Sequence, residues 1–145
     1  MNKLETTIHQ FQSLDDDFRL DLLLDYAEKL PVLPEKYQAA KDIGLNRVHE
    51  CQTPVYLWVE VEQGKVKIFA DVAEEAPTVR GIVSILVNSL TDASPAEIEN
   101  IPNDLLFRLG IGQRVGMVRI QGLSAILYRI KKEVEKQLKS DHLDS

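Results

Sequence analysis

The sequence predicts an α+β fold in which a small antiparallel sheet packs against several helices. Apolar residues recur at helical spacing before residue 44 and again after residue 77. Between these regions, two segments alternate between apolar and polar residues, which is the period of a strand. The turn residues Gln63-Gly64 join the two segments into a hairpin, and we expect a sheet of about three strands built on it.

Two helices are expected at the start of the chain. The first covers residues 3–12. Ser13, followed three residues later by Asp16, resembles a capping box, in which short polar side chains satisfy the first free N–H groups of a helix. The helix that follows has one apolar face and ends at Pro31, because proline has no N–H and crowds the preceding turn.

A third short helix and the hairpin come next. The helix is expected over residues 34–43, with Gly44 as a left-handed C-terminal cap. The strands are expected over residues 55–61 and 66–70. Trp58 lies on the strand face opposite the core valines, and we expect a helix to cover that face.

The helical period returns after the hairpin. A helix is expected from Thr78 to Leu90, and the pair Ser94-Pro95 is typical of a helix N-terminus. A short helical turn is expected over residues 105–109. The last helix should run from about Gln121 to Leu138, with a charged and solvated end.

Length and composition limit the classes of protein. A chain of 145 residues, 44% hydrophobic and 28% charged, predicts one soluble domain, residues 1–145. A net charge of −6 argues against a nucleic-acid partner, because phosphate contacts need clustered lysine and arginine. The start of the chain does not resemble a secretory signal, and no apolar run reaches the roughly 18 residues of a membrane span. We therefore expect a cytoplasmic protein that does not associate with a membrane.

The single cysteine, Cys51, is the main candidate for chemistry. One thiol cannot form an internal disulfide, and three scattered histidines do not complete a usual zinc site, so we expect no metal. Pro54 cannot donate to a central ladder, which places Cys51 on a loop that leads into the first strand. Three roles are open to it: a buried apolar filler, a free surface thiol, or a nucleophile.

The charge around Cys51 has no single sign. A thiolate is the reactive form of cysteine, and nearby cations favour it by lowering the thiol pKa. Arg47 and His49 would act in that direction, whereas Glu50 would act against it. The local sequence leaves the direction of any pKa shift open.

Several segments together resemble the SufE family of sulfur-acceptor proteins. Asn46–Leu57 (NRVHECQTPVYL) resembles the family signature, in which Asn-Arg-Val leads into Gly-Cys-Gln-Ser and a strand that starts Val-Trp. Residues 30–34 (LPVLP) are similar to its Leu-Pro-x-Leu-Pro element. Residues 70–71, followed by residues 79–82 (VRGI), resemble its acidic turn and next helix. Residues 119–123 (RIQGL) resemble the start of its last helix. The four elements occur in the family's order.

The resemblance implies a SufE/NifU-like fold and a role in sulfur relay. A partner cysteine desulfurase, SufS-like and dependent on pyridoxal phosphate, would transfer a persulfide sulfur to Cys51. The acceptor would stimulate the desulfurase and deliver the sulfur to a scaffold complex for iron–sulfur cluster assembly. The pyridoxal phosphate would belong to the partner, so this chain would be a cofactor-free accessory protein and not an enzyme. We expect it to be a monomer or a weak homodimer.

The resemblance also implies supporting residues around the persulfide carrier Cys51. Arg119 would help to hold a thiolate or persulfide anion, unless it is only a surface or capping arginine. Asp71 would orient the cysteine loop or cap the end of the hairpin. Gln52 would bond loop backbone groups. His49 is the weakest candidate, as a base for the thiol.

Glu50 departs from the family pattern, which usually has glycine before the cysteine. Two other classes of function remain open: an interaction module with an inert Cys51, and a cysteine hydrolase that uses His49 as its base. In the sulfur-carrier reading, we predict that the loop holds Cys51 partly buried against apolar residues and exposes it when a partner docks.

Overall fold

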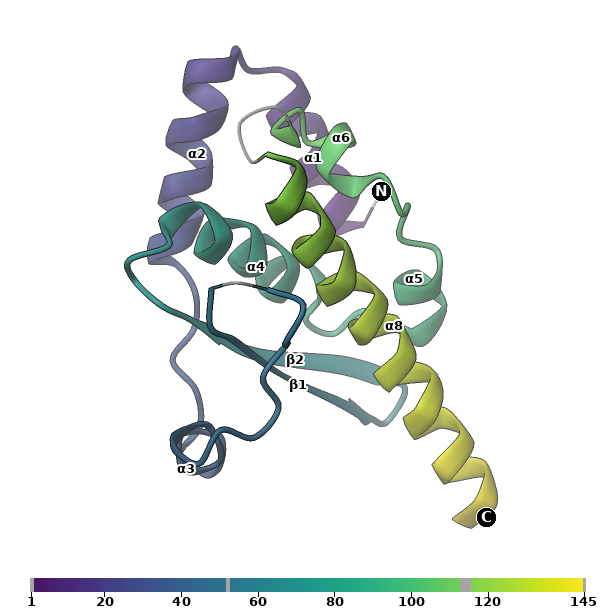
Figure 1. Ribbon diagram of the computed structural model, residues 1–145. Coiled ribbons are helices and arrows are strands. Elements are labelled where there is room, and N and C mark those ends of the chain that lie inside the picture. Colours follow the sequence, from purple (N-terminus) through teal and green to yellow (C-terminus); the bar gives the residue numbers. More distant parts are fainter. Residues whose placement is uncertain (1, 52, 113–115, 145) are drawn as a thin grey trace.

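An antiparallel hairpin lies at the centre of the protein, with helices on both of its faces (Figure 1). The computed structural model describes residues 2–51, 53–112 and 116–144 and, within the last helix, the side chains of residues 120–139. The strands are β1 (Val55–Glu62) and β2 (Lys65–Val72). The helices are α1 (Lys3–Gln12), α2 (Asp16–Glu28), α3 (Glu35–Asp42), α4 (Pro77–Leu90), α5 (Pro95–Glu99), α6 (Leu105–Arg108) and α8 (Met117–Asp144). The predicted α+β class is confirmed.

The hairpin forms where alternation predicts it. Val55 pairs with Val72 at one end and Glu62 with Lys65 at the other. The residues between the strands, Gln63 and Gly64, have φ angles of 52° and 74°. Positive φ at both central positions is the requirement of the commonest two-residue hairpin turn, and glycine meets it without strain.

The expected count of about three strands is wrong for the described part of the chain, where the sheet has two. A third segment makes only an isolated bridge, between Arg47 and Tyr56. Beside it, the Leu57 N–H donates to the Asn46 carbonyl at 3.1 Å. Asn46 has a φ of 62°, so the backbone turns there and the paired segment is too short to count as a strand.

The two faces of the hairpin are covered differently. On one face, α4 packs against β2 and α8 crosses β1, and this side holds the main core (Figure 1). On the other face, the Tyr37 ring of α3 stacks on Trp58 at 4.8 Å and meets Phe69 at 5.1 Å, centroid to centroid. The prediction that a helix covers the Trp58 face is confirmed.

Further contacts fix the long helices around the hairpin. The Gln137 side chain of α8 accepts a hydrogen bond from the Val61 N–H at 2.8 Å and donates to the Val59 carbonyl, which covers the free edge of β1. Gly81 of α4 lies so close to α2 that an added Cβ would fall 2.4 Å from the Leu23 carbonyl oxygen. The close approach of α2 and α4 therefore depends on that glycine.

The start of α2 and both ends of α8 differ from the sequence prediction. Ser13 does not cap α2: its hydroxyl donates to the Gln10 carbonyl at 2.8 Å and so closes α1, whereas Asp15 is the N-cap residue of α2. A short polar side chain between two helices can serve either end, and here it satisfies the earlier one. The last helix begins at Met117 and reaches Asp144, longer at both ends than its apolar stripe predicts.

Among the described residues, no helix combines the length and apolar character that a membrane crossing requires. The same residues contain no group of three or more His, Cys, Asp and Glu side chains arranged to bind a metal ion.

Candidate functional site

Cys51 lies on the loop that leads into β1, as predicted, and its side chain is buried, with 7% of the residue exposed. The base of the loop is closed by the Val48 N–H, which donates to the Val55 carbonyl at 2.8 Å. The Cys51 N–H then turns back to the Val48 carbonyl at 3.2 Å. Both valines are fully buried. A rigid base therefore carries a short loop with the thiol turned inward.

The thiol packs against α8. Cys51 Sγ donates a hydrogen bond to the Gly122 carbonyl oxygen at 3.4 Å. A Cβ on Gly122 would lie 3.2 Å from that sulfur and 3.4 Å from the Glu50 carbonyl oxygen. These contacts are tight for a side chain, so the absence of one at Gly122 lets the loop approach the helix.

The surroundings of Cys51 favour the neutral thiol. Burial, and then the nearby Glu50 carboxylate, raise the pKa of the Cys51 thiol to about 11. The Cys51 pKa, whose direction of shift the sequence leaves open, is therefore raised, and the neighbouring Arg47 and His49 do not reverse that shift. We call this arrangement, with the thiol held against α8, the closed loop. At neutral pH its sulfur is protonated and weakly nucleophilic.

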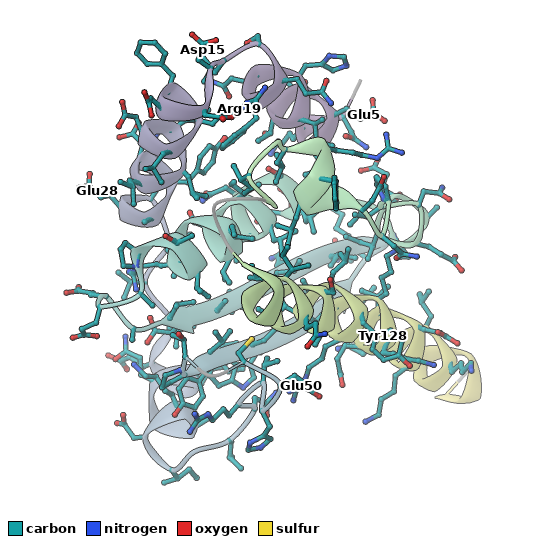
Figure 2. All side chains as sticks on the ribbon, turned by 45° about the horizontal axis from the view of Figure 1, so that its top comes forward. Glu5, Asp15, Arg19, Glu28, Glu50 and Tyr128 are labelled. Atoms are coloured by element: carbon teal, nitrogen blue, oxygen red, sulfur yellow. The ribbon has the colours of Figure 1, made fainter. Side chains whose placement is uncertain are left out.

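The residues just before Cys51 face solvent. His49 and Glu50 are both exposed, and Figure 2 shows Glu50 on the loop beside α8. The hydrogen bond of Cys51 Sγ goes to the Gly122 backbone and not to His49. The structure thus gives His49 no geometry of a base that activates the thiol in the closed loop.

Asp71 ties the hairpin to two helices. It sits in β2 opposite Tyr56 and accepts a hydrogen bond from Lys41 of α3. Arg80 of α4 pairs with it at 3.6 Å and also donates to the Val72 carbonyl at 2.5 Å. These contacts favour the role at the end of the hairpin over a direct role in the cysteine loop.

Two predicted site residues cannot be placed against the thiol. Gln52 lies outside the described residues. Arg119 belongs to the first turn of α8, and its side chain is outside the described part of that helix.

Two residues with direct contacts to the loop were not among the predicted site residues. Gly122 stands inside the quoted RIQGL segment, and a glycine within a helical pattern is itself a signal of close packing. Arg129 of α8 donates from Nη1 to the Arg47 carbonyl at 2.9 Å. No sequence pattern points to Arg129, because a partly exposed arginine on a charged helix is ordinary.

Fold and site together define a small α+β protein that carries one buried thiol on a loop held against its last helix. Residues 5–134 match the model of the SufE family, described as an Fe-S metabolism associated domain. The chain therefore belongs to the SufE family, and its role is in Fe-S metabolism.

Relatives and a solved structure support the family assignment. The chain is 32% identical over 134 residues to an uncharacterised SufE-like protein of Mycobacterium tuberculosis, with 92% of each chain covered. It is 28% identical over 135 residues to the cysteine desulfuration protein SufE of Plasmodium falciparum, covering 89% of this chain and 52% of that one. A solution structure of a hypothetical protein from Thermus thermophilus superposes with a TM-score of 0.82 at 35% identity, covering 96% of this chain and 99% of that chain.

Proposed function

We propose that this protein accepts sulfur as a persulfide on Cys51 from a partner cysteine desulfurase, stimulates that enzyme, and delivers the sulfur for iron–sulfur cluster assembly. The observation that carries the proposal is the position of the only cysteine, on a loop with a fixed base and a weakly held tip. Membership of the SufE family and the name of the Plasmodium relative, a cysteine desulfuration protein, support the same role.

The proposed transfer is a thiol–persulfide exchange. The Cys51 thiol loses its proton, and the thiolate attacks the outer sulfur of the persulfide on the desulfurase. A new S–S bond forms on Cys51 while the S–S bond of the donor breaks, and the donor cysteine leaves as a thiolate. The exchange needs no external oxidant or reductant, because one S–S bond replaces another. The pyridoxal phosphate that generates the first persulfide belongs to the desulfurase.

The closed loop is the resting state in this proposal. With its sulfur 3.4 Å from the Gly122 carbonyl and its pKa raised to about 11, Cys51 is neither accessible nor ionised. Docking must therefore move the loop tip away from α8 before attack. Moving the thiol into a polar environment with cations would also lower its pKa.

The supporting residues would act in different ways. Arg119 would hold the thiolate or persulfide anion after opening, and Gln52 would order the loop backbone. Asp71 would act indirectly, through its ion pairs with Lys41 and Arg80. A hydrolase that uses His49 is disfavoured, because the thiol hydrogen bond goes to a backbone carbonyl.

One observation favours a second candidate, an interaction module in which Cys51 only fills space. The thiol is buried among core residues and its pKa is raised, as for an inert cysteine. In that case the protein would bind the desulfurase without taking up sulfur.

Intact mass measurement separates the two candidates. The protein is incubated with a cysteine desulfurase and L-cysteine, without reductant, and its intact mass is measured by mass spectrometry. The sulfur carrier gains one sulfur atom, and the Cys51→Ser variant gains none and fails to stimulate release of alanine. Stimulation by Cys51→Ser equal to wild type, with no mass gain in either, would establish the interaction module instead.

A further inference from the structure

Two hydrogen bonds between described residues attach the cysteine loop to α8. At the tip, Cys51 Sγ donates to the Gly122 carbonyl. At the base, Arg129 Nη1 donates to the Arg47 carbonyl at 2.9 Å. Gly122 and Arg129 are about two helical turns apart, so both contacts arise from one face of α8.

The Arg47 carbonyl, which accepts the hydrogen bond from Arg129, lies on the outer edge of the short segment that pairs with β1. Asn46 and Val48 direct their backbone groups to β1, where they bond Leu57 and Val55. The intervening Arg47 directs its own carbonyl to the opposite edge, because backbone groups alternate along a paired segment. Without Arg129, this edge carbonyl would lose its guanidinium donor.

The two attachments differ in strength. The base combines three paired-segment hydrogen bonds, two from the backbone and one from the Asn46 side chain, with the guanidinium bond from Arg129. A hydrogen bond from a charged donor is stronger than one between neutral groups. The tip has a thiol donor, which is among the weakest in proteins. Opening should therefore separate the tip from α8 and leave the base in place.

We propose that Arg129 is a positioning residue, which holds the base of the cysteine loop on α8 so that Cys51 swings out from a fixed stem. The stem is the base of the loop, where residues 46–48 pair with residues 55–57. The contact between Arg129 and the Arg47 carbonyl carries this inference. It rests on the proposed function, because a fixed stem matters only if the thiol must meet a donor sulfur in a set orientation.

The test compares Arg129→Met with Arg129→Lys in the full-length protein. Lys132→Met is the matched control: it removes the same charge from an exposed position of the same helix. Two quantities are measured for each variant. The first is the rate of Cys51 alkylation by iodoacetamide at fixed pH, which needs no partner. The second is the rate of persulfide transfer from a desulfurase, measured with the acceptor protein at a concentration that does not saturate the desulfurase.

The positioning role predicts opposite signs for the two rates. Without the anchor the base can leave α8 together with the tip, which gives Cys51 a second way to become exposed, so we expect Arg129→Met to alkylate about three- to tenfold faster, the change that one hydrogen bond makes in an opening equilibrium. Transfer becomes slower, because the thiol is no longer presented from a fixed stem. Arg129→Lys keeps a cationic donor and falls between Arg129→Met and wild type, and Lys132→Met matches wild type in both rates.

Two results would overturn the inference. If both rates rise, Arg129 only keeps the loop shut, and if neither moves, the contact has no effect on the thiol. Hydrogen exchange at the Val48 and Leu57 amides shows whether the stem has loosened, and a thermal melt shows whether the variant has folded. Wild type that alkylates normally but accepts no sulfur would contradict the proposed function, while the alkylation comparison would still test the anchor.

Discussion

The thiol of Cys51 is hydrogen-bonded to the carbonyl oxygen of Gly122, 71 positions further along the chain, at 3.4 Å. This contact joins the loop before β1 to the start of α8 and removes the sulfur from solvent. It makes the proposed carrier unreactive until the loop moves.

The approach of Cys51 to α8 depends on Gly122 having no side chain. In Gly122→Ala, the new Cβ would lie 3.2 Å from Sγ, so the loop tip must shift by a few tenths of an ångström. We expect faster alkylation of Cys51 by iodoacetamide, although alanine favours the helix by about 1 kcal/mol over glycine. Ser124→Ala, at an exposed position of α8, is the control for helix propensity. Equal alkylation rates in Gly122→Ala and wild type would show that the loop does not rest on the helix there.

Glu50 is the charged group that raises the pKa of Cys51, after burial. We expect Glu50→Gln to lower that pKa from about 11, but not to the ordinary value, because burial remains. The pH dependence of the alkylation rate measures it. Glu74→Gln, which removes an exposed carboxylate from another loop, should leave the thiol pKa unchanged. An unchanged pKa in Glu50→Gln would mean that burial alone sets it.

The same pKa makes stability depend on pH. The folded thiol pKa of about 11 lies above the ordinary value of 9.0, so its contribution is fully present below pH 9. As the pH rises from 9 toward 11, the unfolded chain ionises first and the contribution is lost, by about 1.4 kcal/mol per pH unit. Urea unfolding of wild type and Cys51→Ala across this range isolates the effect, since tyrosines and lysines titrate in both. A constant difference between the two proteins would show that the thiol titrates normally.

Local signals were sufficient for much of the fold. The alternating residues and the Gln63-Gly64 turn predicted the hairpin, because its pairing is set within a few residues of the turn. The first helix, Lys3–Gln12, also has the predicted bounds. The sequence predicts the wrong helix end for Ser13, because a capping side chain next to two helix ends carries no sign of which end it serves.

The site was predictable only in part. Cys51 and its loop followed from Pro54 and from the resemblance, which are local features of the sequence. The partners of the loop, Gly122 and Arg129, come from the other end of the chain. Their contacts depend on where α8 crosses β1, and no spacing within one segment encodes that crossing.

Asp71 provides the sharpest test of how far the site extends. Its ion pairs with Lys41 of α3 and Arg80 of α4 join these helices to β2, and its hydrogen bond raises the pKa of Lys41. In Asp71→Asn we expect a loss of about 1 kcal/mol in the free energy of unfolding, because these pairs are only partly buried. The alkylation rate of Cys51 should not change, since the described contacts of Asp71 lie at the end of the hairpin and not in the loop. Urea unfolding and iodoacetamide kinetics on the same preparation measure both. An altered alkylation rate with unchanged stability would instead show that Asp71 orients the cysteine loop, the alternative that the family resemblance leaves open.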